Sequence, residues 1–200
     1  MKLSVRIFDL VLAFILFVIL LIPMSIVALM IKLTSKGPTI YKQLRTGYKE
    51  NDFYIYKFRT MSVGSDKTGS ITIGNDRRIT KIGKILRKTK VDEFPQLINI
   101  FRGEMSFVGP RPDTPEYTEY YKKYNSSYFD LVPGITGKAS IYLSNEEELM
   151  SKVENPKDFY VNEIIPKKVG LNSYHLNHFN IFDNLKIMIE TVFKVVKNDE

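Results

Sequence analysis

The sequence contains no cysteine and only two histidines, His175 and His178. Without cysteine the chain can form no disulfide, no thiolate nucleophile and no cysteine-ligated metal centre. The two histidines lie three residues apart with no third metal-ligand pattern beside them, which favours a structural role. The sequence also lacks repeats and low-complexity tracts. Its 200 residues therefore predict one compact domain with some chain left for an appendage.

Acidic residues are absent where basic residues are densest. Between Asp76 and Asp92 the chain has no acid, and its basic residues there are Arg77, Arg78, Lys81, Lys84, Arg87, Lys88 and Lys90. The net charge of +7 favours an anionic partner, such as a membrane surface, a nucleic acid or a phosphorylated ligand. Nucleic acid is disfavoured, because no nucleic-acid-binding motif is recognisable and the basic run ends at two acids.

Charged residues are also missing from Leu10 to Ile31, a run of 22 residues. As a helix this run would be roughly 33 Å long, which is enough to cross the apolar core of a bilayer. A buried helix of a soluble protein is one alternative, and the near-total apolarity argues against it. A cleaved signal peptide is the other, and no small-residue cleavage site follows Ile31.

A proline interrupts this apolar run. Pro23 is expected to kink the helix, and the Ser25 hydroxyl is expected to pair with the freed carbonyls. Basic residues flank the run on both sides: Lys2, Arg6, Lys32, Lys36, Lys42 and Arg45. The positive-inside rule therefore gives no orientation. We favour a re-entrant helix, broken at Pro23, over a straight span, with Asp9 at headgroup depth beside Arg6.

The chain as a whole predicts an α+β fold that is mainly α-helical. We expect the re-entrant membrane helix over residues 1–36 and a compact cytosolic domain over residues 37–200. Residues 39–41 and 53–58 have the composition of two strands, and the polar turn after Gly47 joins them into a small β-hairpin.

Two amphipathic helices are expected to lie at the membrane interface. The first combines an apolar stripe of Ile79, Ile82, Ile85 and Leu86 with a basic stripe of Arg77, Lys81, Lys84 and Lys88. The basic stripe would rest on anionic lipid headgroups, although a merely solvated face is the plainer alternative. The last helix has an apolar face that packs on the core or lies on the membrane: Leu185, Met188, Ile189, Val192, Phe193 and Val196.

Two adjacent carboxylates, Asp92 and Glu93, follow the basic run. Proline is tolerated in the first turn of a helix, so Pro95 places a helix start close to the pair. The positive end of that helix would hold a carboxylate in its ionised form and would also attract a phosphate. Taken alone, the pair is most simply a helix cap. Its basic neighbours make a functional site the stronger interpretation.

Four basic residues are candidates for binding an anion near this pair. Lys57 and Arg59 are two residues apart at the end of the second predicted strand, so they would share one face, which could also be solvated. Arg87 lies close to the carboxylate pair in the sequence. Arg111 stands between two prolines that stiffen its backbone, and its planar fork suits phosphate oxygens.

Three further segments have weaker chemical assignments. The tyrosine-rich stretch 115–128 fits ordinary packing about as well as a membrane interface. The Gly/Pro loop 133–137 would allow a close backbone approach to a ligand. Glu146 to Glu148 are consecutive on a predicted exposed helix and point in different directions, so solvation is favoured over metal binding.

The order of these motifs resembles that of the small monotopic phosphoglycosyl transferases, the bacterial sugar transferases of capsule, O-antigen and glycoprotein assembly. The resemblance extends over nearly the whole chain. It is carried by Arg6-Ile7-Phe8-Asp9, Tyr56-Lys57-Phe58-Arg59-Thr60-Met61, Asp92-Glu93-Phe94-Pro95-Gln96-Leu97, Met105 to Pro112, and Pro133 to Gly137. Several motifs in one order are a specific signal, whereas any one of them alone would be weak.

The resemblance implies an enzyme at the cytoplasmic face of the bacterial inner membrane. It would move a phosphosugar from a UDP-sugar to polyprenyl (undecaprenyl) phosphate and release UMP. Asp92 would be the nucleophile, would form an aspartyl-phosphosugar intermediate in a ping-pong mechanism, and would associate with Mg²⁺. Glu93 would deprotonate or orient the lipid phosphate. Arg111 would hold phosphate, with Lys57, Arg59 and Arg87 around it. A homodimer stays open.

The chain departs from the family pattern at two places. Ile22-Pro23 stands where many members have Ser-Pro, and Lys138 to Leu143 replaces a Gln-Val-Asn-Gly-Arg stretch, which leaves the sugar unpredicted. Two other functions stay open. A membrane-attached transferase could act by direct displacement, with Asp92 only a Mg²⁺ ligand. A membrane-tethered polyanion-binding module would not be an enzyme.

Overall fold

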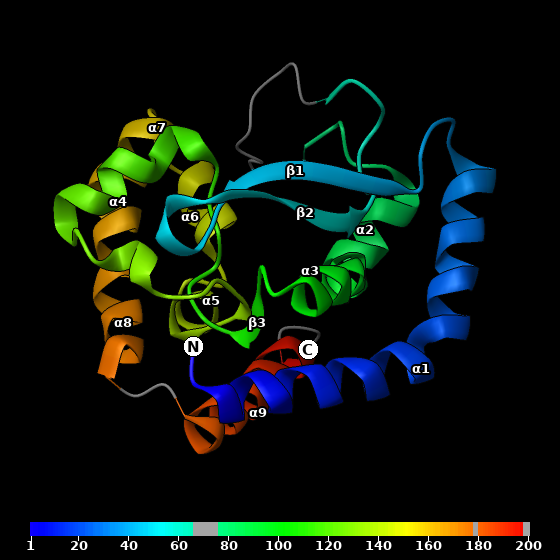
Figure 1. Ribbon diagram of the computed structural model, residues 1–200. Coiled ribbons are helices and arrows are strands. Elements are labelled where there is room, and N and C mark those ends of the chain that lie inside the picture. Colours follow the sequence, from blue (N-terminus) through cyan, green and yellow to red (C-terminus); the bar gives the residue numbers. More distant parts are fainter. Residues whose placement is uncertain (66–75, 178–179, 198–200) are drawn as a thin grey trace.

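The computed structural model of the chain describes residues 1–65, 76–177 and 180–197. Its α-helices are α1 (Leu3–Thr34), α2 (Lys81–Lys88), α3 (Leu97–Arg102), α4 (Thr118–Tyr124), α5 (Lys138–Tyr142), α6 (Glu146–Ser151), α7 (Pro156–Phe159), α8 (Ile165–Asn177) and α9 (Ile181–Lys197). Short 3₁₀ or π turns are η1 (Tyr48–Glu50), η3 (Val91–Gln96), η4 (Pro115–Tyr117), η5 (Tyr128–Asp130) and η6 (Tyr160–Ile164). The strands are β1 (Ile40–Thr46), β2 (Asp52–Phe58), β3 (Ser106–Val108) and β4 (Gly134–Thr136). The mainly helical expectation is confirmed (Figure 1).

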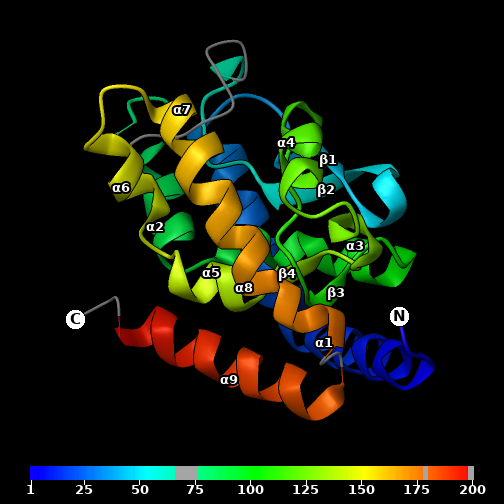
Figure 2. The ribbon, with the colours of Figure 1, turned by 90° about the vertical axis from the view of Figure 1, so that its left-hand side faces the viewer.

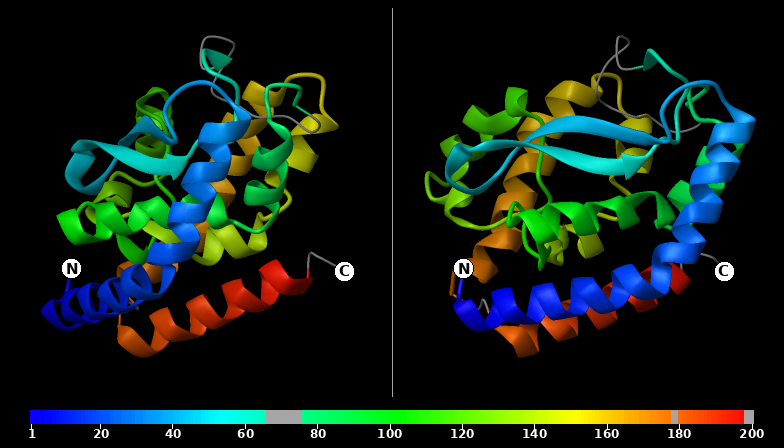
Figure 3. Two further views of the ribbon diagram at one scale, coloured as in Figure 1. Left: turned by 90° about the vertical axis from the view of Figure 1, so that its right-hand side faces the viewer. Right: turned by 45° about the vertical axis from the view of Figure 1, so that its right-hand side comes forward.

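The first helix, α1, is bent. Its first part runs beneath the rest of the molecule, and its last part turns up along the side (Figures 1 and 3). Pro23 lies inside the helix, and a proline ring that displaces the preceding turn is the usual cause of such a bend. By length and composition α1 could cross a membrane. The way in which it meets a bilayer stays a prediction.

The Ser25 hydroxyl does not repair the bond that Pro23 breaks. Proline has no N–H to give to the Ile19 carbonyl four residues earlier. Ser25 instead donates to the Leu21 carbonyl at 2.8 Å. The expected pairing with the freed carbonyl is therefore wrong. A serine hydroxyl in a helix reaches the carbonyl four residues before itself, which for Ser25 is that of Leu21 and not the freed carbonyl of Ile19.

Arg6 and Asp9 attach α1 to the domain separately from each other. Arg6 donates to the Ile100 carbonyl at 2.7 Å and to the Phe101 carbonyl at 3.2 Å, near the carboxyl end of α3. Asp9 has no exposed surface at all. The depth of Asp9 in a bilayer stays a prediction, whereas the expected ion pair with Arg6 is not formed within the described ranges.

The predicted β-hairpin is confirmed. β1 and β2 pair antiparallel along their whole length. Phe53 and Ile55 of β2 are buried in one core cluster with Leu97 and Ile100 of α3. This packing lays the hairpin over α3 (Figure 1). It also brings β2 against η3, with Lys57 near the end of β2 contacting Glu93 of η3.

The basic helix α2 is amphipathic, but one residue was assigned to the wrong face. Ile82 and Leu86 pack in a cluster with residues of the last part of α1. Ile85 was expected in the same apolar stripe and is instead 63% exposed. It lies four residues after Lys81 and three before Lys88, so it projects with the exposed basic residues.

The parallel pair β3–β4 was not predicted, and it fixes the two loops that carry Gly109 and Gly134. The Gly109 N–H donates to the Thr136 carbonyl at 2.8 Å, and the Gly134 N–H donates to the Pro110 carbonyl at 2.9 Å. A Cβ atom on Gly134 would lie only 2.1 Å from the Gly109 nitrogen, so no larger residue fits. The close backbone approach made by loop 133–137 is thus to the turn that holds Arg111.

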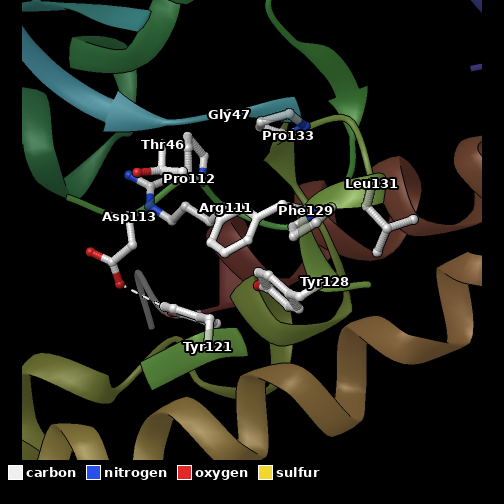
Figure 4. Close-up of a pocket in the computed structure, with 11 residues that line it drawn as sticks. Thr46, Gly47, Arg111, Pro112, Asp113, Tyr121, Tyr128, Phe129, Leu131 and Pro133 are labelled. Carbon is white, nitrogen blue, oxygen red and sulfur yellow. Dashed lines mark hydrogen bonds between the residues drawn. The ribbon is translucent and has the colours of Figure 1, made fainter. Parts of the chain in front are cut away.

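The tyrosine-rich segment packs mainly inside the domain. Tyr117, Tyr121 and Tyr128 are buried in a second core cluster with residues of α8, which runs beside α4 (Figure 2). The rings of Tyr121 and Tyr128 stack at 4.7 Å. The pocket between these rings and the Arg111 backbone measures only ≈ 10 Å³, room for about one water molecule (Figure 4). Packing, not a membrane interface, explains these three residues.

α9 and the first part of α1 lie side by side beneath the domain (Figures 1 and 3). Ile187 of α9 and Ala13 of α1 are buried in the same core cluster. The predicted apolar face of α9 is mostly left uncovered, with Ile189, Val192 and Phe193 more than half exposed. Since Ala13 belongs to that core, residues 1–36 share packing with the rest, and the division at residue 36 stays a prediction.

Candidate active site

Asp92 and Glu93 lie in η3, between α2 and α3. Lys90 precedes this turn with a φ of 58°, a left-handed conformation that ends the α2 region and redirects the chain. Pro95 lies within η3, and the helix continues directly into α3. The helix start predicted beside the carboxylate pair is therefore confirmed. Both side chains are buried, at 6% and 8% exposure.

Glu93 is held by two cations. Arg111 donates from Nη1 to Oε2 at 3.1 Å and from Nη2 to Oε1 at 2.5 Å, and Lys57 Nζ lies 3.3 Å from Oε1. Burial alone would raise the pKa of the Glu93 carboxyl, but Arg111 and Lys57 outweigh it and hold that pKa well below its usual value. Burial lowers the pKa of Lys57 to about 8, although the charge of Glu93 opposes this.

Asp92 has no such partner. Its Oδ1 atom is buried and accepts no hydrogen bond from the described part of the chain. Burial raises the pKa of Asp92, and the charge of Lys57 lowers it only in part. The expectation that the helix start holds a carboxylate ionised is met at Glu93, whose pKa is lowered, and stays a prediction for Asp92. A buried polar atom without a partner costs about 1–3 kcal/mol, and a ligand or ion can supply the missing contact.

Asp92 suits a Mg²⁺ ion better than Glu93 does. Mg²⁺ usually takes one or two carboxylates and completes its shell with water and substrate phosphate oxygens. Both Glu93 oxygens are engaged by Arg111 and Lys57, whereas Asp92 Oδ1 is unpaired. Among the described residues no group of three or more His, Asp or Glu side chains forms a fuller cage.

The two histidines add nothing to this site. His178 lies outside the described residues, and the side chain of His175 is not described either. Their predicted structural role therefore stays a prediction.

Arg59 and Arg87 occupy different positions. Arg87 is half-buried, donates from Nε to Thr60 Oγ1 at 3.0 Å, and lines the same cavity as the carboxylate pair. Arg59 is 5% exposed and donates to the Lys36 carbonyl at 2.6 Å and to both oxygens of Ser35. Arg59 borders the cavity too, but its guanidinium is committed to the carboxyl end of α1.

One large cavity, of about 1220 Å³, joins these residues. Lys57, Asp92, Glu93 and Arg111 line its charged part. Apolar side chains of α1 and α9 line another part of it: Leu16, Leu20, Val192 and Val195. The volume exceeds the roughly 300–1,000 Å³ that is usual for a pocket holding one small ligand.

Sequence reasoning missed a second charged group in this cavity, centred on Asp113. Asp113 accepts a hydrogen bond from the Tyr121 hydroxyl at 3.0 Å (Figure 4). It also accepts one from the Tyr160 hydroxyl and pairs with Arg45 at 3.4 Å. Burial opposes ionisation, but the charges of Lys168 and Arg45 hold the pKa of Asp113 below its usual value. The position of Asp113 directly after the Arg111 motif was the signal that could have revealed it.

Lys168 and Glu146 extend this group. Lys168 Nζ lies 2.9 Å from Glu146 Oε2 and donates to the Tyr160 hydroxyl at 2.8 Å. Glu146 was expected to be solvated with the other two glutamates of its run. The structure corrects this for Glu146 alone, because the approach of α8 to α6 draws it into an ion pair. No local sequence pattern marks Lys168.

The sequence matches the family described as bacterial sugar transferase over residues 1–198. The chain belongs to the bacterial sugar transferase family. It is 35% identical, over 93% of its length, to the UDP-glucose:undecaprenyl-phosphate glucose-1-phosphate transferase of Escherichia coli K12. It is 34% identical, over 97% of its length, to an uncharacterised sugar transferase, EpsL, of Bacillus subtilis 168. The resemblance inferred from the motifs is thereby confirmed.

The matched relatives of this bacterial sugar transferase differ in length and in the sugar they are named for. The chain spans 39% of the Escherichia coli protein and 88% of the Bacillus subtilis one. A third relative, the UDP-N-acetylgalactosamine-undecaprenyl-phosphate N-acetylgalactosaminephosphotransferase of Aeromonas hydrophila, is 36% identical over 66% of this chain and 33% of its own length. Glucose and N-acetylgalactosamine both occur among these names, so family membership does not select the sugar.

Proposed function

We propose that the protein transfers a sugar 1-phosphate from a UDP-sugar to undecaprenyl phosphate and releases UMP. The observation that carries the proposal is an unpartnered buried carboxylate oxygen, on Asp92, in one cavity with two cations fixed by Glu93. Phosphoryl transfer needs positioning and charge neutralisation above all, and Lys57 and Arg111 offer both. The names of the relatives support the same substrates.

In the first step, a carboxylate oxygen of Asp92 attacks the sugar-bearing phosphorus of the UDP-sugar. The bond from this phosphorus to the bridging oxygen breaks, and UMP leaves with the electron pair. Lys57 and Arg111 neutralise charge on the phosphate oxygens as it develops. The resulting aspartyl-phosphosugar divides one difficult displacement into two easier ones.

In the second step, an oxygen of undecaprenyl phosphate attacks the same phosphorus. The bond to Asp92 breaks, the carboxylate is regenerated, and the sugar remains on a diphosphate attached to the lipid. A phosphate monoester is mostly a dianion above its second pKa of about 6, so the acceptor needs no strong base. The low pKa and occupied oxygens of Glu93 favour a positioning role, in which it orients Arg111 and Lys57.

We also propose that the site works with Mg²⁺. Asp92 Oδ1 is the protein atom that fits the ion, since it is buried and unpaired. When bound, Mg²⁺ supplies further neutralisation of the diphosphate charge.

Attachment to the cytoplasmic face of the inner membrane, with α1 re-entrant, completes the proposal. α1 and α9 leave apolar residues uncovered along neighbouring helices, as an interfacial anchor does. Leu16, Leu20 and Val192 of these helices also line the cavity. A prenyl chain in the bilayer could thus place its phosphate beside Asp92. Contact of the basic face of α2 with anionic headgroups, and a homodimer, stay predictions.

Release of UMP tests this function. Full-length protein in nanodiscs is mixed with undecaprenyl phosphate, Mg²⁺ and each of several UDP-sugars, and UMP and lipid-linked sugar are measured. We expect both products in equal amounts from at least one donor, and neither from Asp92→Asn, which keeps the size and capping ability of the side chain. Wild-type protein that binds lipid vesicles but releases no UMP from any donor would support the polyanion-binding module instead.

A further inference from the structure

The cavity has a second polar region that the proposed chemistry does not use. It is formed by Glu146 of α6, Tyr160 of η6 and Lys168 of α8, here called the Lys168 cluster. Lys168 Nζ contacts Glu146 Oε2 at 2.9 Å and the Tyr160 hydroxyl at 2.8 Å, and the two charged side chains are only 13% and 23% exposed. The contacts fix an ammonium and a carboxylate at the cavity surface.

The charge of this region differs from that around Asp92. Beside the carboxylate pair, the cavity carries Lys57, Arg87, Lys90 and Arg111. These four cations exceed the two acids there and suit an anionic diphosphate. Around the Lys168 cluster, Lys168 and Arg45 pair with Glu146 and Asp113, and Glu147 also lines the cavity, so positive charge is not in excess there. A balanced set of donors and acceptors suits a neutral polar group.

Two further polar atoms in the cavity lining lack partners. Ser140 Oγ and Asn172 Oδ1 are buried and form no hydrogen bond with the described residues. Ser140 lies on α5 and Asn172 on α8, which pack against each other. Lys168 Nζ contacts both Glu146 oxygens, at 3.1 and 2.9 Å, and the Tyr160 hydroxyl, so the ammonium is held in place while the Glu146 carboxylate keeps lone pairs for a ligand hydroxyl. Hydroxyl groups, which both donate and accept, match this set.

The Lys168 cluster also lies within electrostatic range of the phosphate-binding cation, because the charge of Glu146 contributes to raising the pKa of Arg111. Contacts connect the two as well: Asp113, two residues after Arg111, accepts a hydrogen bond from Tyr160, and Tyr160 accepts one from Lys168, so a group joined to a phosphate at Arg111 could reach the cluster. A flat base would need an open aromatic face. The Tyr160 ring offers none, since Lys168 Nζ lies 4.6 Å from its centre and Tyr117 packs against it at 4.8 Å.

We propose that the Lys168 cluster recognises hydroxyl groups of the hexose in the UDP-sugar and so selects the donor. Glu146 and Lys168 contact the sugar directly, and Tyr160 positions Lys168. This inference rests on the proposed function and adds to it the residues that determine sugar specificity.

The variants Lys168→Met and Glu146→Gln test the proposal, with Lys168→Arg as a conservative substitution. Lys167 and Glu163 provide a matched control, since they form an exposed ion pair at 3.3 Å on the neighbouring turn, away from the cavity lining. UMP release is measured for UDP-glucose, UDP-galactose and their N-acetylamino counterparts, and the affinity for UDP alone is measured by competition.

We expect Lys168→Met and Glu146→Gln to lower kcat/KM for the preferred donor about tenfold or more. The ratio of kcat/KM between the preferred donor and the other donors should move toward one. Lys168→Arg should recover part of the preference, Lys167→Met should match wild type, and UDP affinity and the KM for undecaprenyl phosphate should not change. An unchanged donor ratio, or a loss of UDP affinity equal to that for UDP-sugars, would overturn the proposal. Wild-type protein inactive with every donor would overturn the proposed function itself.

Discussion

Arg111 donates hydrogen bonds to Glu93 from both terminal nitrogens, at 3.1 and 2.5 Å. Glu93 therefore fixes the orientation of the Arg111 guanidinium. The arrangement separates the roles of two adjacent acids. Both oxygens of Glu93 accept hydrogen bonds from Arg111 or Lys57, whereas Oδ1 of Asp92 has no partner among the described residues. The predictions below follow from that division.

Arg111→Lys should lower kcat/KM for the UDP-sugar on the order of 100-fold, because an ammonium cannot span both Glu93 oxygens and still present a planar donor pair to phosphate. Glu93→Gln should lower activity and also the free energy of unfolding, by roughly 1–3 kcal/mol, since it removes the charge partner of Lys57, which is 18% exposed, and of Arg111, which is 37% exposed. Steady-state kinetics and urea unfolding measure the two effects. A fully active Glu93→Gln protein of unchanged stability would contradict the positioning role.

The activity should fall at alkaline pH because of Lys57. Its pKa is lowered from 10.5 to about 8, so the ammonium loses its proton as the pH rises through about 8. We expect kcat/KM for the UDP-sugar to fall about tenfold per pH unit above that point. Lys57→Arg should remove the alkaline fall, because arginine stays charged.

Unfolding does not explain that fall. Between pH 8 and 10.5 the unfolded chain binds more protons at Lys57 than the folded chain does, so this group makes stability rise with pH. An equally steep alkaline fall in an active Lys57→Arg protein would assign the titration to another group.

Arg59 should behave as a structural residue, in contrast to Arg87. Arg59→Met removes three hydrogen bonds to Ser35 and Lys36 and should lower Tm, while the KM for the UDP-sugar in the folded protein stays near that of wild type. Arg87→Met should raise that KM with a smaller change in Tm. Thermal unfolding and steady-state kinetics on both variants test this contrast. A raised KM with little change in Tm for Arg59→Met would show instead that Arg59 binds the substrate phosphate.

The bend at Pro23 should set the membrane topology. The chain has no cysteine, so single cysteines at Lys2 and Lys36 can be labelled without background. In inside-out and right-side-out vesicles, a membrane-impermeant maleimide should reach both sites from the cytoplasmic side. Pro23→Leu, which restores the missing N–H, should place a fraction of the Lys2 site on the opposite side. Opposite-side labelling in the wild-type protein would contradict a re-entrant helix.

Local patterns predicted the local parts of the structure well. Strand-like composition and a polar turn indicated the β-hairpin, and Pro95 placed a helix start beside Asp92 and Glu93. Burial was harder to predict. The burial of Asp9 was not predicted, because the first part of α1 packs on the domain and nothing in the segment itself shows that contact.

The Asp113 and Lys168 contacts could not be predicted because they join distant elements. Arg45 lies on β1, in a segment that shares in the family resemblance, but Tyr160 in η6 and Lys168 on α8 belong to no recognisable local pattern. Their pairing depends on how these elements pack. The family motifs therefore indicated the residues around the reacting phosphate. The Lys168 cluster, which we infer to select the sugar, could be recognised only from the three-dimensional structure.

The most direct test of the central claim is intact mass of the purified protein after incubation with UDP-sugars and Mg²⁺ in the absence of lipid acceptor. Covalent catalysis at Asp92 predicts a mass gain equal to one phosphosugar in the wild-type protein, loss of that gain when undecaprenyl phosphate is added, and no gain in Asp92→Asn. UMP release that requires the lipid, with no adduct under any donor, would contradict the covalent mechanism and favour direct displacement.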